Sequence, residues 1–143
     1  MGATAAGAED LRGHTERLGF QRDHVVLELG YDDDSDDDLR AAIEAVTGSP
    51  IVDDDYDDVA DVVLLWWRED DGDLADALVD ALAVIDDGGI IWLFTPKAGR
   101  DGHVEPSDIA EAAPTAGLSA TKSTAAAPNW SGTRLVAPRV HRR

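Results

Sequence analysis

The sequence predicts an α/β protein with a mostly parallel sheet, helices on both faces of that sheet and an antiparallel C-terminal strand. Apolar runs at 62–67 and 90–94 show no polar alternation, which is typical of strands buried on both faces. These runs alternate with segments of helical periodicity, the pattern of a layered α/β domain. The last two strand candidates follow one another without a helix between them, so at least part of the pair must be antiparallel.

The N-terminal half contains four expected elements, in chain order: a helix at 11–18, a strand at 24–29, a helix at 37–46 and a very short strand at 51–52. The first strand is a β-branched apolar run closed by Gly30. Asp36 or Ser35 can cap the second helix, and Gly48 is expected to end it.

The C-terminal half contains six more: a strand at 61–67, a helix at 74–85, a strand at 90–94, a helix at 106–113, and strand candidates at 118–125 and 134–137. The helix at 74–85 has the clearest apolar face, and we expect Gly88 and Gly89 to end it. Ser107 is the expected cap of the next helix. This order predicts a three-layer, Rossmann-like domain over 11–138, between a disordered N-terminus (1–10) and a basic tail (139–143).

The charge balance narrows the classes of partner. The chain of 143 residues has 30 acidic and 12 basic side chains, and 26 of the acids lie in the first 87 residues. A surface of this sign disfavours binding to nucleic-acid phosphates or to a membrane through basic residues. Cysteine is absent, which excludes disulfides and zinc ribbons, and no apolar run is long enough to span a bilayer. The N-terminus lacks the pattern of a signal peptide, so we expect a cytoplasmic protein.

Two aspartate clusters, at 32–38 and 53–58, raise the question of calcium binding. An EF-hand loop needs glycine at its sixth position and glutamate at its twelfth. Those positions hold Asp37 and Ile43 in the first cluster, and Asp58 and Leu64 in the second. We therefore interpret both clusters as solvated charge and expect no metal site. A weaker hypothesis is that the acidic residues of the first 87 positions imitate nucleic acid and bind a basic partner.

A cofactor site is the main question for a fold of this class. Glu28 and Gly30 stand where a Rossmann domain carries its cofactor motif, but Tyr31 and two aspartates replace the further glycines. Asp53, after the short second strand, has the position of a ribose-binding acid. S-adenosylmethionine is thus a candidate cofactor, although we favour a fold that has lost it. No histidine pair, nucleophile elbow or phosphate loop is present, so we predict no catalytic residues.

The tryptophans suggest a different kind of site. Trp66 and Trp67 end a central strand, at the carboxyl edge where α/β proteins bind ligands. Successive strand residues point to opposite faces, so one of the two can line a given pocket. We predict a ligand or partner surface that combines four residues: Trp67, Thr95, Lys97 and Trp130. The alternative is that both tryptophans cover the sheet beneath helices.

Five segments resemble one known family: 27–32, 61–68, 92–97, 102–109 and 130–135. They are similar to a small acidic actinobacterial family known as domain of unknown function 3052, over roughly residues 8–138. The resemblance implies a cytoplasmic bacterial protein with no assigned activity and supplies no catalytic residues. The order of strands and helices also resembles a shortened class I methyltransferase-like Rossmann fold.

Together these observations predict a non-catalytic Rossmann-like protein that binds or regulates through contacts with another protein or a small ligand. The alternative is a divergent S-adenosylmethionine-dependent methyltransferase, based on Glu28, Gly30 and Asp53. Nucleic acid and membrane are not expected partners.

Overall fold

A computed structural model describes residues 13–137 of the chain. The expectations for the N-terminus (1–10) and the basic tail (139–143) lie outside these residues. The strands are β1 (Val26–Leu29), β2 (Ala60–Trp66), β3 (Ile85–Pro96), β4 (Ser119–Ala127) and β5 (Trp130–Val136). The helices are α2 (Asp37–Thr47), the 3-10 turn η1 (Glu69–Asp71), α3 (Leu74–Leu82) and α4 (Pro106–Thr115). Residues 13–17 form a further helical turn.

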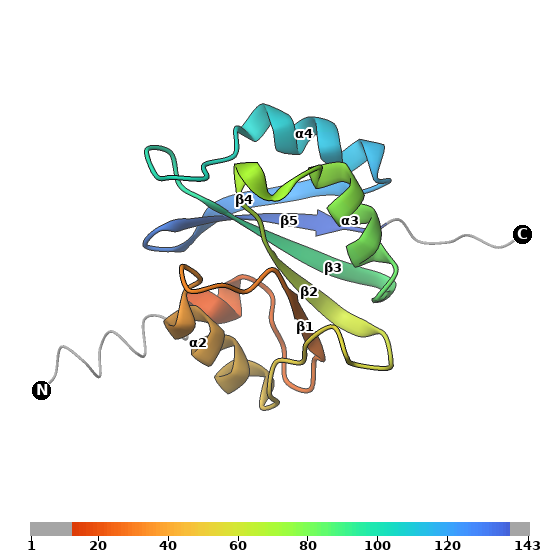
Figure 1. Ribbon diagram of the computed structural model, residues 1–143. Coiled ribbons are helices and arrows are strands. Elements are labelled where there is room, and N and C mark those ends of the chain that lie inside the picture. Colours follow the sequence, from red (N-terminus) through yellow and green to blue (C-terminus); the bar gives the residue numbers. More distant parts are fainter. Residues whose placement is uncertain (1–12, 138–143) are drawn as a thin grey trace, which may run out of the picture.

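The five strands form one sheet in the order β1-β2-β3-β5-β4 (Figure 1). β1, β2 and β3 are parallel, and β5 lies antiparallel between β3 and β4. The expected strand at 51–52 is reduced to a single parallel bridge between Val52 and Leu27, on the free side of β1. The mostly parallel sheet with an antiparallel C-terminal strand is therefore confirmed.

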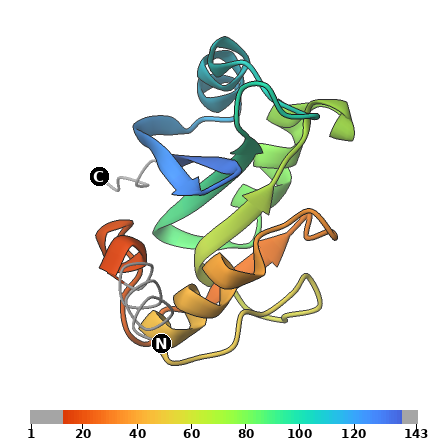
Figure 2. The same cartoon turned by 90° about the vertical axis from the view of Figure 1, so that its left-hand side faces the viewer.

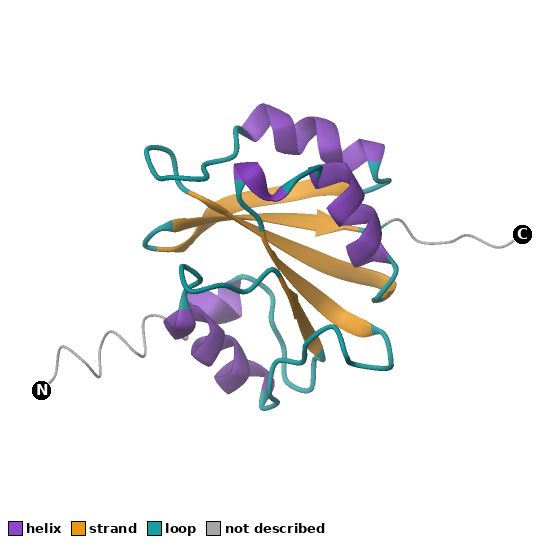
Figure 3. Cartoon of the chain, in the orientation of Figure 1, coloured by secondary structure: helices purple, strands orange, loops and turns teal. Residues whose placement is uncertain are grey.

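Helices cover both faces of the sheet, as the colours of Figure 3 make plain. One face packs against α3 and α4 through a core that includes Leu78, Leu93 and Ile109. The opposite face packs against α2, with Leu39 and Ile43 against Trp66. The view in Figure 2 shows the strong twist between β1 and the β4–β5 hairpin. Because β2 is buried on both faces from Val62 to Trp66, the apolar run that starts at Val62 was a sound indicator of its place in the sheet.

Local signals set most of the element ends. Asp36 caps α2, its side chain accepting a hydrogen bond from the Leu39 amide, and Gly48 ends the helix with a left-handed backbone. Ser107 does not cap α4. The helix begins at Pro106, as expected, so Ser107 is its second residue and Glu105 holds the cap position. Proline suits the first helical position because it has no amide hydrogen to leave unpaired there.

The end of α3 was predicted wrongly. The helix stops at Leu82, and Gly88 and Gly89 lie inside β3 instead of ending the helix. At this point the pairing of β2 with β3 shifts register, which requires a bulge. Gly88 has a φ of 75°, and a Cβ on Gly89 would stand 3.0 Å from the carbonyl oxygen of Asp61. Both glycines thus serve the bulge.

Within residues 13–137, no helix is both long and apolar enough to cross a membrane.

Candidate binding site at the carboxyl edge of the sheet

Glu28, the last but one residue of β1, is buried and fully engaged in the fold. Its two carboxylate oxygens accept hydrogen bonds from the Arg40 guanidinium on α2, at 2.6 and 2.8 Å. The same carboxylate accepts a third hydrogen bond, 2.9 Å long, from the indole nitrogen of Trp66. A bidentate pair of this kind is among the stronger polar contacts in proteins. Glu28 therefore joins β1, β2 and α2.

Gly30 follows β1 with a left-handed backbone, at a φ of 80°. A Cβ at this position would overlap the carbonyl oxygen of Trp66, at a separation well under 3.0 Å. The chain leaving β1 consequently presses directly against the end of β2. This close approach explains the glycine without reference to a ligand.

Arg68 fixes the β1–α2 loop (residues 30–36) to the end of β2. Its guanidinium donates a 2.8 Å hydrogen bond to the carbonyl of Gly30 and pairs with the carboxylate of Asp34. The guanidinium also lies 5.2 Å from the ring centre of Trp130, within the range of a cation–π contact. The Trp130 indole in turn donates a hydrogen bond to the carbonyl of Asp34. We call this set of four residues the Arg68 clamp.

The clamp shifts the pKa of the Asp34 carboxyl. The Arg68 hydrogen bond holds the pKa of the Asp34 carboxyl below its ordinary value. The Arg68 side chain is 12% exposed, while that of Asp34 is 54% exposed. The clamp thus holds the β1–α2 loop against the end of β2 through an ion pair at the surface, and both groups of this pair are charged at neutral pH.

A cavity of about 450 Å³ remains beside the clamp, at the carboxyl ends of β1 and β2. We call it the crevice. Its lining includes Gly30, Tyr31 and Asp32 from the loop and Trp67 and Asp80 from the other side. Rossmann-like proteins bind their ligands outside the carboxyl ends of such strands. Asp53 does not line the crevice, because it lies in an exposed group with Asp54 and Asp55.

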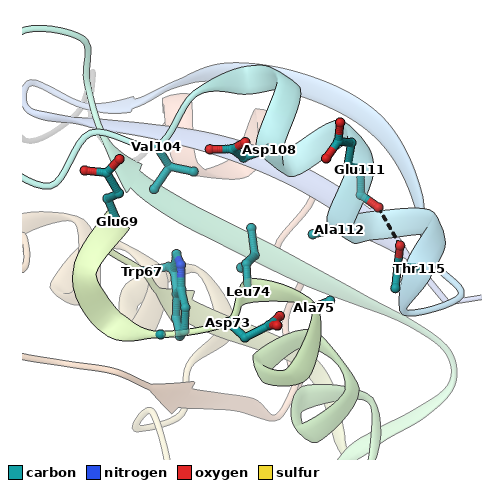
Figure 4. A pocket seen from close by; sticks show the side chains of 11 residues that line it. Trp67, Glu69, Asp73, Leu74, Ala75, Val104, Asp108, Glu111, Ala112 and Thr115 are labelled. Atoms are coloured by element: carbon teal, nitrogen blue, oxygen red, sulfur yellow. Dashed lines mark hydrogen bonds between the residues drawn. The ribbon is translucent and has the colours of Figure 1, made fainter.

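Trp67 separates the crevice from a second cavity of about 320 Å³, between α3 and α4. We call this the Trp67 cavity. Figure 4 shows the Trp67 ring standing at its α3 side, with Leu74 and Val104 between the two helices. Ala112 completes the apolar part of the lining. An aromatic wall and an apolar floor are common features of ligand pockets of this size.

Four carboxylates also line the Trp67 cavity: Glu69, Asp73, Asp108 and Glu111. Among residues 13–137, no basic side chain lines it. Asp73 caps α3 through the Asp76 amide. Across the described residues, none of the four carboxylates has an ion-pair partner. The cavity is therefore electronegative and has a π-face, a combination suited to a cationic group.

The structure does not gather the four residues of the predicted surface on one open face. Trp130 and Thr95 are buried, Trp130 against the Trp66 ring at 4.9 Å between ring centres. Trp67 and Lys97 are half-buried, and only Trp67 lines either of the two cavities just described. As expected from strand alternation, Trp66 packs on the α2 side, and Trp67 packs on the α3 side.

Arg68 is the residue that sequence reasoning missed. One signal was available, since it is one of only five bases in the first 87 residues and directly follows a buried strand. The carboxylates of the Trp67 cavity were missed for a different reason. They come from η1, the N-cap of α3 and α4, which only the packing of these segments brings together.

The fold is a methyltransferase-like Rossmann fold, as its similarity to solved structures shows. The riboflavin-derivative dimethyltransferase RosA from Streptomyces davawensis is similar over 96% of this chain and 56% of its own, with a TM-score of 0.66 at 11% identity. The glycopeptide N-methyltransferase MtfA is similar over 92% and 90%, with a TM-score of 0.58 at 12% identity. At such identities the likeness concerns the fold alone.

The chain belongs to the family described as "Protein of unknown function (DUF3052)", whose model matches residues 15–139. Uncharacterized proteins of Mycobacterium tuberculosis (strain ATCC 25618 / H37Rv) and Mycobacterium bovis are each 51% identical over 138 residues. The alignments cover 96% of this chain and 87% of each relative. The resemblance to an actinobacterial family is therefore confirmed.

Proposed function

We propose that this protein is a non-catalytic binding or regulatory module, and that its ligand or partner presents a cationic organic group to the Trp67 cavity. The observation that carries the proposal is the lining of that cavity: a tryptophan face and four carboxylates that have no counter-charge among the described residues. An ammonium or guanidinium group would satisfy the carboxylates and stack on the ring, while its carbon chain would contact the apolar floor.

The non-catalytic part of the proposal is supported by the contacts of the three residues that were candidates for binding a cofactor. Glu28 is bonded to Arg40 and Trp66, and Gly30 is required by the close approach to Trp66. Asp53 stands apart from the crevice. Glu28 and Gly30 are thus explained by their contacts within the fold, and Asp53 lies outside the crevice in which a cofactor would bind.

The proposal is tested by calorimetric titration of the purified chain with agmatine, which carries both a guanidinium and an ammonium group. We expect saturable binding that the pair Asp108→Asn with Glu111→Gln weakens at least tenfold, and that Trp67→Leu also weakens. The matched control is Asp53→Asn with Asp54→Asn, which removes the same charge from an exposed cluster outside the cavity. Equal losses in both pairs would indicate unspecific attraction and would refute the site.

The crevice favours the alternative, a divergent S-adenosylmethionine-dependent methyltransferase. The crevice is at the expected strand ends, its volume of about 450 Å³ is within the usual range for small ligands, and its acids suit a cationic cofactor. Among similar solved structures, the magnesium protoporphyrin IX methyltransferase ChlM from Synechocystis contains bound S-adenosylmethionine, with a TM-score of 0.54 at 11% identity. Titration with S-adenosylmethionine separates the two hypotheses.

A further inference from the structure

A third cavity, of about 230 Å³, lies between α4 and the sheet and has a different chemical character. Hydroxyl groups line its sheet side: Thr95 on β3, Ser123 on β4, and Ser131 and Thr133 on β5. Pairing places them together, because Thr95 lies opposite Ser131 and Thr133 lies opposite Ser123. We call this the hydroxyl cavity.

The fold uses none of these four hydroxyls, although two of them belong to buried residues. Thr95 is 2% exposed and Thr133 is 7% exposed. Within residues 13–137, neither side chain makes a hydrogen bond, and the same holds for Ser123 and Ser131. Yet no buried side-chain oxygen or nitrogen of the described part is both sealed from solvent and unbonded. The two threonine hydroxyls must therefore open into the cavity that they line.

The sequence of the strands makes these hydroxyls conspicuous. Leu93 precedes Thr95 on the same face of β3, and Leu135 follows Thr133 on the same face of β5. Valine has nearly the shape of threonine and would bury without leaving a polar group unpaired. On β4 the small side chains of Ala120 and Ser123 leave the space that forms the cavity.

Apart from His103, the remaining lining is apolar. Val104, Pro106, Ile109 and Ala110 form the α4 side, and no carboxylate, lysine or arginine of the described chain lines the cavity. His103 stands at its edge, where the Nδ1 atom lies 2.9 Å from the carbonyl of Pro96 and the Nε2 atom lies 3.6 Å from the Glu105 carboxylate. A group of hydroxyls opposite an apolar wall recognises polar but neutral groups.

We propose that the hydroxyl cavity is a second binding site, for a small neutral molecule that carries hydroxyl or carbonyl groups on one side and carbon on the other. Its volume is below the range of about 300–1,000 Å³ that is usual for drug-sized ligands. The ligand is therefore of the size of a short polyol or amide. This site is independent of the proposed cation site, although Val104 lines both cavities.

The test is an amide-resolved NMR titration of the full chain with glycerol and with N-methylacetamide. We expect saturable shifts at the amides of Thr95, Ser131 and Thr133 with at least one of these probes. Thr95→Val combined with Thr133→Val should weaken that binding at least tenfold. The control is Thr124→Val, on the opposite face of β4 and outside the cavity, which should leave binding unchanged.

Two further measurements make the result decisive. The double valine variant should unfold at the same temperature as the parent protein or higher, because the hydroxyls have no partner to lose. The Asp108→Asn with Glu111→Gln pair should bind the neutral probe normally, which separates this site from the Trp67 cavity. The proposal would be overturned if neither probe gave saturable shifts, or if binding survived the valine pair. It would also be overturned if the anion acetate bound more tightly than the neutral probes, or if the valine pair clearly lost stability.

Discussion

Replacing Gly30 by alanine separates the two explanations of this glycine. In the structure its φ is 80°, and the new Cβ would overlap the carbonyl oxygen of Trp66. A left-handed backbone costs an alanine about 1–2 kcal/mol. Relief of the overlap, by moving the loop or the end of β2, costs a further ~1–3 kcal/mol. We therefore expect Gly30→Ala to lower the free energy of unfolding by ~2–5 kcal/mol, a large share of the ~5–15 kcal/mol typical of a domain.

The matched control is Gly99→Ala. Gly99 has nearly the same φ, 87°, but apart from its own two chain neighbours no described residue lies within 4 Å of the place that its Cβ would take. This variant should show only the backbone cost, about 1–2 kcal/mol. Urea unfolding of both variants, followed by tryptophan fluorescence, measures the difference. If the two substitutions cost the same, the packing of Gly30 against Trp66 is not what requires a glycine there.

Two other predictions concern the ion pairs at this edge of the sheet. Glu28→Gln should lower the free energy of unfolding, measured in urea, by ~2–4 kcal/mol, because it breaks a buried ion pair and leaves Arg40 without its carboxylate. The control is Asp37→Asn, at the exposed 3.5 Å contact with Arg40, which should lower it by less than about 0.5 kcal/mol. Because Asp34 has a lowered pKa, the stability it adds is present above the unfolded value of ~3.9 and is lost as the pH falls through the folded value. The protection of the β1–α2 loop amides against hydrogen exchange, relative to the intrinsic exchange rate at each pH, should therefore fall below about pH 4, and Arg68→Met should remove that step. An unchanged step would contradict the clamp.

The layers and the strand directions could be predicted because they depend on local patterns. The unbroken apolar run of β2 marked a strand buried on both faces, and Asp36 and Gly48 marked the ends of α2. Gly88 and Gly89 misled the prediction, because a glycine pair after a helical pattern signals a helix end and a strand bulge equally well. Pairing with β2 decided between the two.

The site could be predicted only in part. Trp67 was expected to face a cavity, because it ends a strand at the carboxyl edge of the sheet, and it does line two cavities. The clamp was beyond sequence reasoning, since Arg68 meets Asp34 from 34 positions away and Trp130 from still farther along the chain. Hydroxyl residues such as Thr133 looked like ordinary strand residues until the packing of α4 left them without partners.

Titration of the purified chain with S-adenosylmethionine in a calorimeter tests the central claim most directly. We predict no binding tighter than about 100 µM, which corresponds to roughly −5.5 kcal/mol, because Glu28 is bonded to Arg40 and Trp66 and Gly30 is packed against Trp66. Tighter binding that is lost in Asp80→Asn, which lines the crevice, and kept in Asp108→Asn with Glu111→Gln would contradict the account. The protein would then be a cofactor-binding methyltransferase relative.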